Sequence, residues 1–219
     1  MFPVGDDNSQ RRTFPYVTTA LIILNVLVFL LELAQGEQFI TEWAFIPARF
    51  SDEPGADAVT LFTAMFMHGG WMHLIGNMVF LWVFGDNVED RIGHGKFLIF
   101  YLLAGLAATF AQYGFNSHSA IPNVGASGAI AGVLGAYILM FPQARVNVLL
   151  GRQIVAMPAF AVLGLWIVFQ LISGVGTIAY TDESADVGGI AYMAHIGGFF
   201  AGLAMALLAR GWWNQGDTA

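Results

Sequence analysis

The sequence predicts an all-α membrane protein: a bundle of six transmembrane helices with a long interfacial loop between spans one and two. Its 219 residues are 57% hydrophobic and only 11% charged, with a mean hydropathy of +0.67. A soluble domain usually has about 25% charged residues, so this composition cannot give a globule of this size a polar surface. In addition, the chain holds six apolar stretches, and its cations gather on one side of them.

Six apolar stretches each approach the roughly 20 residues that cross a bilayer core of about 30 Å. Arg11 and Arg12 precede the first stretch, as they would in a signal peptide. Its apolar run is longer than the roughly 7–15 residues of a signal-peptide core and more spans follow, so we expect a retained span. The predicted spans cover residues 16–33, 71–88, 97–113, 127–141, 158–172 and 190–209.

The charges of the loops predict the orientation, because cytoplasmic loops are enriched in Lys and Arg. Seven of the eight cations fall on one side of the spans, and the other side receives only Arg49. We therefore expect a multi-pass protein of the cell membrane with both termini cytoplasmic: a tail at 1–15, one domain at 16–210 and a tail at 211–219. The seven cations are Arg11, Arg12, Arg91, Lys96, Arg145, Arg152 and Arg210, and the outer acidic residues are Glu37, Glu42, Asp52, Glu53, Asp57, Asp182, Glu183 and Asp186.

A long loop at residues 35–60 joins the first two spans and contains the segment FITEWAFIPARF. Its aromatic residues and few charges predict a position at the outer interface, with Trp43 and Phe45 at the level of the lipid headgroups. The alternative is an ordered loop that packs on the bundle.

Composition excludes several classes of function. The net charge is −7 and no basic patch is present, which argues against nucleic-acid binding. The absence of cysteine excludes disulfides, thiolate nucleophiles and cysteine-based zinc sites. A metal site is disfavoured because His68 and His73 would lie about 140° apart on a regular helix, and no H-E-x-x-H pattern occurs. We therefore expect no metal and no other cofactor.

Four polar residues lie inside spans or at their mouths, where such groups are costly and usually functional. His73 and Asn77 belong to span two, Ser127 begins span four, and His195 belongs to span six. In the expected orientation these spans are all entered from the outer side, so the four residues lie within roughly 10 Å of the outer helix ends. Three separate spans thus place polar groups at a similar depth.

Glycine spacing predicts that spans four and six touch near these ends. Gly128 and Gly132 form one G-x-x-x-G pair, and Gly198 and Gly202 form another on the same helix face as His195. Such pairs let helix backbones approach closely in lipid. The polar ends of the two spans would then meet.

A serine beside a histidine can act as a nucleophile with its general base, because the hydroxyl needs a base to take its proton. We therefore expect Ser127 to be the nucleophile and His195 the base. Candidate donors to the oxyanion are the Ser127 backbone N–H, the Asn77 amide and the His73 ring. Glu89 lies 16 residues beyond His73, roughly 24 Å along the helix. We therefore predict a Ser–His dyad without a carboxylate.

Each pattern taken alone has a more ordinary explanation. G-x-S-G in a membrane bundle is more often a packing feature, and a single intramembrane histidine can serve as a packing hydrogen-bonder. A proton-coupled transporter would carry Asp or Glu centrally in its spans, whereas Glu32 and Asp86 lie near span ends. The combination of patterns favours the serine hydrolase.

Three segments, HGGWMHLIGNMVFLWVFGDNVE, GASGAIAG and AHIGGFFAG, together resemble the rhomboid family of intramembrane serine proteases. Their order and the six-span layout resemble that family too, over roughly residues 61–202. The family's H-x-x-x-x-H-x-x-x-N pattern falls on His68, His73 and Asn77, its G-x-S-G on Gly125, Ser127 and Gly128, its A-H-x-x-G-x-x-x-G on Ala194, His195, Gly198 and Gly202, and its G-x-x-x-E on Gly85 and Glu89.

The resemblance implies a serine-type endopeptidase that works in the lipid bilayer through an acyl-enzyme intermediate. Ser127 would be the nucleophile and His195 the base. His73 and Asn77 would support the oxyanion, and His68 would support the outer mouth. The substrates would be membrane proteins with helix-destabilising small residues near the outer face. Further supporting positions are Gly125, Gly128, Gly198 and Gly202.

The resemblance also implies an outward-opening cavity, gated by the fifth span and the loop before the sixth. The alternative is a catalytically silent rhomboid-like protein that binds membrane clients. Silent relatives typically lose the Ser or the His, and both are present here.

Two positions depart from the family pattern. Members often carry an aromatic residue four positions after the nucleophile, beneath the base, where this chain has Ala131. The aromatic partner of the base is then missing, or it comes from elsewhere in the chain, with Phe199 and Tyr192 as candidates. The Trp-Arg pair often found before the LFTAMF segment is Val59-Thr60 here, which changes the first loop.

Overall fold

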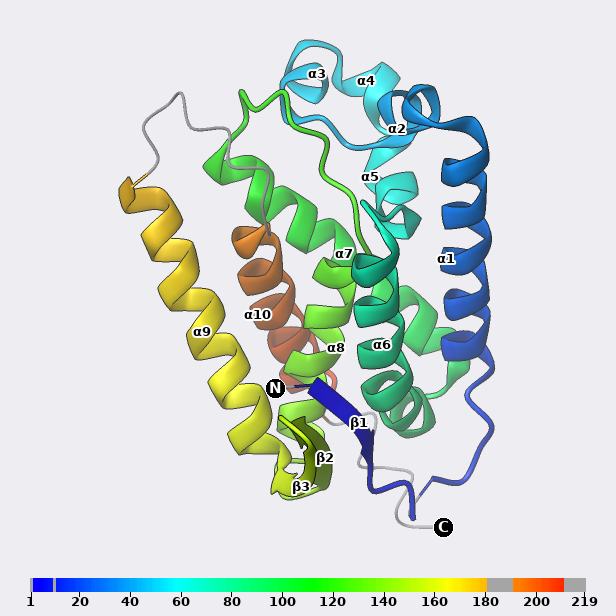
Figure 1. The fold of residues 1–219 in the computed structure, drawn as a ribbon, viewed down its shortest axis with the longest axis vertical. Helices are drawn as coiled ribbons and strands as arrows, with labels where there is room; N and C mark the ends of the chain where they lie inside the picture. Colours follow the sequence, from blue (N-terminus) through cyan, green and yellow to red (C-terminus); the bar gives the residue numbers. More distant parts are fainter. Residues whose placement is uncertain (1, 10, 181–190, 211–219) are drawn as a thin grey trace.

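The computed structural model describes residues 2–9, 11–180 and 191–210, which form a mostly helical bundle (Figure 1). The prediction of a mainly helical protein is confirmed, and within the described ranges a long helix occupies each of the six apolar stretches. These helices are α1 (Tyr16–Gln35), α6 (Trp71–Ile92), α7 (His94–Phe115), α8 (Ser127–Met140), α9 (Ala159–Tyr180) and α10 (Tyr192–Leu208).

The long helices differ in how well each fits a bilayer. Among the described residues, α1 and α7 are long and apolar enough to cross a membrane as single helices. The helical run Pro54–Phe66 and α6 meet the same criterion together, with a bend of 77° between them. The apolar helices Ser127–Met140 and Tyr192–Leu208 are shorter. For Ser127–Met140, a buried central position favours the short length, because neighbouring protein rather than lipid surrounds the helix.

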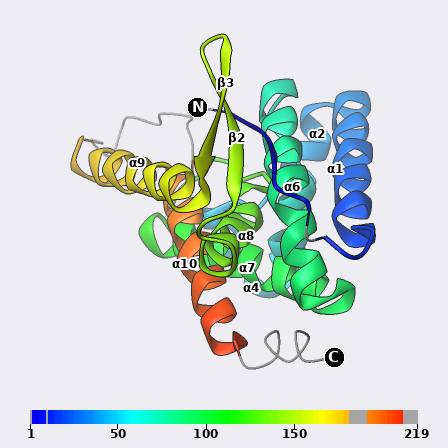
Figure 2. The ribbon, with the colours of Figure 1, turned by 90° about the horizontal axis from the view of Figure 1, so that it is seen from below.

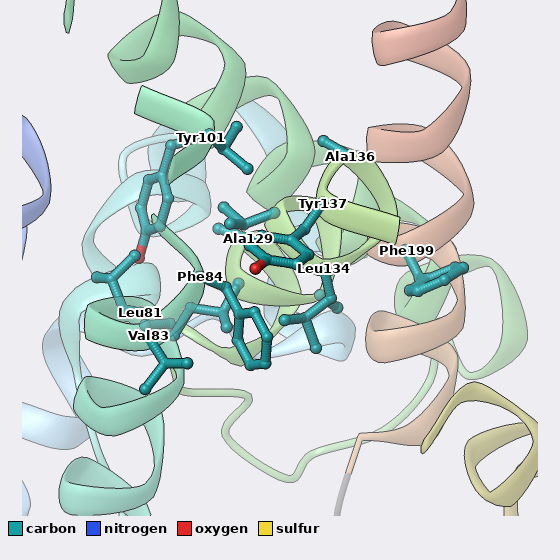
Figure 3. Packing of buried hydrophobic residues seen from close by; sticks show 14 of the residues in the cluster. Leu81, Val83, Phe84, Tyr101, Ala129, Leu134, Ala136, Tyr137 and Phe199 are labelled. Atoms are coloured by element: carbon teal, nitrogen blue, oxygen red, sulfur yellow. The ribbon is translucent and has the colours of Figure 1, made fainter. Parts of the chain in front are cut away.

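Helix α8 lies at the centre of the bundle, beside α6, α7 and α10 (Figure 1). Its residues from Gly128 to Tyr137 are all buried. Towards its C-terminal end, Tyr137 packs edge-on against Phe84 of α6, with ring centroids 4.9 Å apart (Figure 3). The helix that begins at Ser127 is therefore held by protein on several sides.

The long loop after α1 contains four short helices and a 3₁₀ turn, and it packs on the bundle. Phe45 is fully buried, with its ring centroid 5.4 Å from that of Phe50 and 6.2 Å from that of Tyr113 on α7. The packed alternative therefore holds for Phe45, while the depth of Trp43 and Phe45 relative to the headgroups stays a prediction. The elements are α2 (Glu37–Trp43), α3 (Pro47–Asp52), α4 (Pro54–Asp57), α5 (Thr60–Thr63) and η1 (Ala64–Phe66).

A three-stranded antiparallel sheet corrects the expected all-α class. The strands β1 (Phe2–Asp6), β2 (Arg145–Leu150) and β3 (Gln153–Pro158) pair in the order β1-β2-β3 (Figure 2). Pro3 pairs with Val148, so the start of the chain is a strand rather than a plain tail. The segment after α8 is a hairpin because Val146 and Val148 alternate with more exposed residues and bury one face.

Asp6, at the end of β1, fastens this sheet to the bundle. Its carboxylate accepts hydrogen bonds from the Tyr137 hydroxyl of α8 at 2.6 Å and from the Asn87 amide of α6 at 2.5 Å. Burial, with the nearby Asp86 carboxylate, raises the pKa of Asp6 to about 7. Arg11 forms an ion pair with Asp86 at 2.7 Å on the same side of the bundle.

Glu89, on the last turns of α6, caps the start of α1. Its carboxylate accepts hydrogen bonds from the backbone N–H groups of Val17 at 2.9 Å and Thr18 at 2.7 Å, and from the Thr18 hydroxyl. The His94 ring contacts the same carboxylate at 2.6 Å. Glu89 thus satisfies backbone donors that the first turn of any helix leaves unpaired.

Candidate active site

Ser127 and His195 meet across the interface between α8 and α10. Ser127 is the first residue of α8, and His195 lies in the first turn of α10. The distance from Ser127 Oγ to His195 Nε2 is 2.8 Å, which is hydrogen-bonding distance. The arrangement brings a hydroxyl together with a base that can take its proton.

Gly198 and Gly202 of α10 make this meeting possible. A Cβ on Gly198 would lie 2.1 Å from the carbonyl oxygen of Gly128, and one on Gly202 would lie 2.0 Å from that of Gly132. Both distances are far below van der Waals contact, so only glycine lets the two backbones come this close. The predicted contact between these helices is therefore present in the structure.

Gln170 of α9 is a second hydrogen-bond partner of the His195 ring, and it is not among the site residues predicted from the sequence. The distance from Gln170 Oε1 to His195 Nδ1 is 2.9 Å. An amide oxygen can only accept, so Nδ1 carries the proton and Nε2 presents its lone pair to Ser127. The signal in the sequence is an amide inside the apolar run LWIVFQLIS, where a polar side chain needs a partner.

An aromatic ring does lie beside His195, and it comes from Trp166 of α9. The ring centroids of Trp166 and His195 are 5.8 Å apart, with 37° between the ring planes. Phe199 lies behind Trp166, at 6.2 Å between centroids. The aromatic neighbour of His195 thus comes from elsewhere in the chain, from Trp166 of α9 rather than from the candidates Phe199 and Tyr192.

A cavity of about 750 Å³ opens in front of the two residues. Asn77 lines it and is 8% exposed, yet its side-chain nitrogen has no hydrogen-bond partner among the described residues. A buried donor without a partner is costly, so this amide is available to an oxygen of a bound molecule. The lining includes Gly69, Met72, His73, Gly76, Asn77, Ser127, Trp166, Gln170 and His195.

His73 also lines the cavity, one helical turn before Asn77. Its Nδ1 accepts the backbone N–H of Gly69 at 3.3 Å, which leaves the proton of a neutral ring on Nε2 as a donor. A Cβ on Gly125 would lie 3.0 Å from this Nε2 and 3.5 Å from Ser127 Oγ. Gly125 also has a φ of +136°, which favours glycine. Gly125 therefore keeps the space between the two side chains open.

His68 is buried behind His73 rather than in the cavity lining. Their rings meet edge to face with centroids 5.1 Å apart. The backbone N–H of His68 donates to the carboxylate of Glu32 on α1, at 3.1 Å from each oxygen. This contact fixes the turn that leads into α6, so His68 supports the site through its backbone and through ring packing.

No described residue supplies a carboxylate to His195, since its Nδ1 faces an amide. The outer acidic residues Asp182, Glu183 and Asp186 lie outside the described residues, as does the start of the span predicted at residue 190. Within the described ranges, no three His, Cys, Asp or Glu side chains come together as a metal site.

Comparison with known proteins identifies the family of this chain. The Rhomboid domain model matches residues 56–212. The rhomboid protease GluP of Bacillus subtilis is 34% identical over 205 residues, which are 92% of this chain and 36% of GluP. The rhomboid protease GlpG of Klebsiella pneumoniae is 26% identical over 220 residues, 93% of this chain and 71% of GlpG.

Mitochondrial relatives match as well. Rhomboid protein 1 of Saccharomyces cerevisiae is 25% identical over 191 residues, 84% of this chain and 50% of the yeast protein. The chain thus spans half or less of GluP and of the yeast protein, and most of GlpG. Because the domain model covers well over half of the chain and includes both Ser127 and His195, this protein is a member of the rhomboid family.

Proposed function

We propose that this protein is an intramembrane serine endopeptidase that cleaves transmembrane segments near the outer membrane face. The observation that carries the proposal is the 2.8 Å contact between Ser127 Oγ and His195 Nε2 at the wall of a cavity. The relatives GluP and GlpG are rhomboid proteases. A silent client-binding protein would have no need for a hydroxyl and an imidazole held in this geometry.

Acylation begins when Ser127 Oγ attacks the carbonyl carbon of the scissile peptide bond and His195 Nε2 takes the hydroxyl proton. The carbon becomes tetrahedral and its oxygen becomes an oxyanion. As the intermediate collapses, the C–N bond breaks and His195 gives its proton to the leaving amine. The new amino terminus departs, and the other half of the substrate stays bound as an ester of Ser127.

Deacylation repeats these steps with water. His195 Nε2 takes a proton from a water molecule, whose oxygen attacks the ester carbon. The second tetrahedral intermediate collapses, the C–Oγ bond breaks, and Ser127 recovers its proton from His195. The product leaves with a new carboxyl terminus. No cofactor is needed for this sequence.

The oxyanion would be stabilised by three donors: the Asn77 amide, the His73 ring and the backbone N–H of Ser127. The first two line the cavity on the side of Ser127. The Ser127 N–H belongs to the first turn of α8, where backbone donors are not used by the helix itself. Donors already in position act most strongly in a site from which bulk water is excluded.

Six spans with both termini cytoplasmic form part of the same proposal. This topology places Ser127 and His195 close to the outer end of the bundle and Glu89 and the sheet close to the inner end. A substrate helix would have to unwind before its carbonyl could be attacked, since a helix hydrogen-bonds its own carbonyls. Substrates with Gly, Ala or Pro near the outer boundary would therefore be cleaved best.

The test compares purified wild type with Ser127→Ala and His195→Ala on a panel of single-pass membrane proteins, with mass spectrometry of the products. We expect cleavage by wild type only, and labelling of Ser127 by a fluorophosphonate that falls in His195→Ala. Cleavage that persists in pure Ser127→Ala protein would overturn the proposal. The alternative, a silent binding protein, predicts stable complexes with the same panel and no cleavage by wild type.

A further inference from the structure

We propose that Gln170 is a positioning residue for His195, and that the base is therefore correctly oriented only while α9 is seated against the bundle. This inference rests on the proposed function and adds a requirement to it. It makes α9 a part of the catalytic arrangement as well as a wall of the cavity.

The contact comes from a polar side chain on an apolar helix. Gln170 is 5% exposed, whereas Phe169 beside it is 61% exposed and Ile172 is 68% exposed. Gln170 therefore lies on the inner face of α9, with its Oε1 2.9 Å from His195 Nδ1. An amide in an apolar span is costly, and this hydrogen bond is the compensation that the described structure offers it.

The hydrogen bond selects one tautomer of the imidazole. Because Oε1 has no proton, Nδ1 of His195 must donate, and a neutral ring then has its free lone pair on Nε2. Nε2 is the atom that faces Ser127 Oγ at 2.8 Å. Without an acceptor at Nδ1, the ring would also populate the Nε2–H tautomer, which cannot take the serine proton.

Trp166 reinforces the same dependence. It lies one helical turn before Gln170 on α9 and places its ring beside that of His195. One face of α9 thus limits both the rotation of the imidazole, through the indole ring, and its tautomer, through the amide. If α9 moved away from the bundle, His195 would lose both contacts together.

The helix that carries these contacts meets side-chain atoms of α10 at Gly174. Helices α8 and α10 meet backbone to backbone at Gly128 and Gly198, but α9 lies at the edge of the bundle beside α10 (Figures 1 and 2). At Gly174 of α9, the nearest atoms of α10 are the side chains of Met193 and Ile196. Side chains of this kind can change rotamer, so α9 can shift without disturbing the backbone contact between α8 and α10 at Gly128 and Gly198.

The experiment uses the full chain in nanodiscs and three substitutions on α9. Gln170→Leu removes the acceptor at similar size, Gln170→Glu replaces the amide by a stronger acceptor, and Phe169→Leu is the matched control on the lipid-facing side. The first readout is the rate of fluorophosphonate labelling of Ser127 against pH. The second is the tautomer of His195, read from imidazole ¹⁵N chemical shifts and assigned with His195→Asn.

We expect Gln170→Leu to lower the labelling rate about 10- to 100-fold, as loss of an orienting partner commonly does, and to lower the fraction of Nδ1–H tautomer. Gln170→Glu should keep labelling but move the acidic limb of the pH profile to higher pH, because a carboxylate stabilises the imidazolium. Phe169→Leu should match wild type. A purely structural role of Gln170 would not move the pH profile.

Wild-type labelling rates and pH profile in Gln170→Leu would overturn the inference, and so would an equal loss in Phe169→Leu. Failure of the proposed function looks different, because wild type itself would then label at background. The ¹⁵N measurement still decides the inference in that case: a His195 tautomer that is the same in wild type and Gln170→Leu would refute it.

Discussion

A Cβ atom on Gly198 would lie 2.1 Å from the carbonyl oxygen of Gly128. Helix α8, which begins with Ser127, and helix α10, which carries His195, therefore touch through their backbones. Contact of this kind leaves no side chain to adjust. Substitution at position 198 must therefore move a helix.

We predict that Gly198→Ala destabilises the fold by about 1–3 kcal/mol or more, the usual cost of overpacking, and that it also separates the hydroxyl from the imidazole. Thermal unfolding in detergent and fluorophosphonate labelling measure the two effects. The matched control is Gly164→Ala on α9, where a Cβ would meet no atom within 4 Å. Equal stability of the two variants would contradict the close packing.

Asn77→Ala should lower the rate of peptide cleavage about 100- to 1,000-fold, the range seen when one oxyanion donor is removed, with little change in thermal stability. The reason is that its side-chain nitrogen bonds to no described residue and that Asn77 lines the cavity. Steady-state kinetics on a cleaved substrate would measure the effect.

Asn25→Ala is the comparison for Asn77→Ala. The Asn25 amide donates to the Leu21 carbonyl within α1 at 2.7 Å and does not line the cavity. We expect this variant to keep the wild-type turnover. If both asparagine variants lost turnover and stability alike, Asn77 would have no special role in the reaction.

Glu89→Ala should lower the unfolding free energy by about 1–3 kcal/mol for leaving buried donors unsatisfied. The carboxylate bonds to the start of α1 and to His94, and Glu89 lies 12 residues beyond Asn77 along α6. We therefore expect labelling of Ser127 at low temperature to stay near wild type. The unfolding free energy of Glu89→Gln should fall between those of wild type and Glu89→Ala, because the glutamine amide keeps one accepting oxygen. A loss of labelling before any loss of stability would contradict this separation.

The docking of β1 on the bundle should weaken as pH rises towards about 7. The reason is that burial, as the main cause, raises the pKa of Asp6 to about 7 in the docked strand. In the detached strand Asp6 has its ordinary pKa of 3.8 and is ionised above it. The docked strand holds the proton up to about 7, so docking binds a proton and loses stability as pH rises between these values.

Hydrogen exchange of the β1 amides, corrected for the intrinsic effect of pH, tests this direction. Protection should be higher at pH 5.5 than at pH 8 in wild type, and Asp6→Asn should remove the difference. The other charges near Asp6 are Asp7, Arg11 and Asp86, and all are unchanged in this variant. A pH effect of the same size in Asp6→Asn would assign it to one of them.

The sequence was sufficient for the helical core and for the central pair of the site. Long apolar runs leave few alternatives to helices, and glycines at a spacing of four mark where helices approach. Ser127 and His195 could be joined by reasoning because both are polar groups at similar depth on helices with matching glycine faces. The 2.8 Å contact agrees with that reasoning.

The contacts that α9 makes with His195 and the pairing of the three strands could not be predicted in this way. Gln170 and Trp166 reach His195 only because of how α9 is placed beside α10, and no spacing in the sequence encodes that placement. The sheet depends on the pairing of Pro3 with Val148, which are far apart in the chain. Strands of five or six residues next to long apolar helices give too weak a pattern to separate from the span ends.

The glycine contacts between α8 and α10 have a consequence for how this site can vary. The backbone contact between α8 and α10 sets the distance between the Ser127 hydroxyl and the His195 imidazole. Substitutions among lipid-facing side chains would therefore leave the reacting pair intact. Adaptation to a new membrane or a new client can then proceed on the periphery of the bundle. Control of the reaction would act on the orientation of the imidazole, which the outlying helix governs, while the distance between the two backbones stays constant.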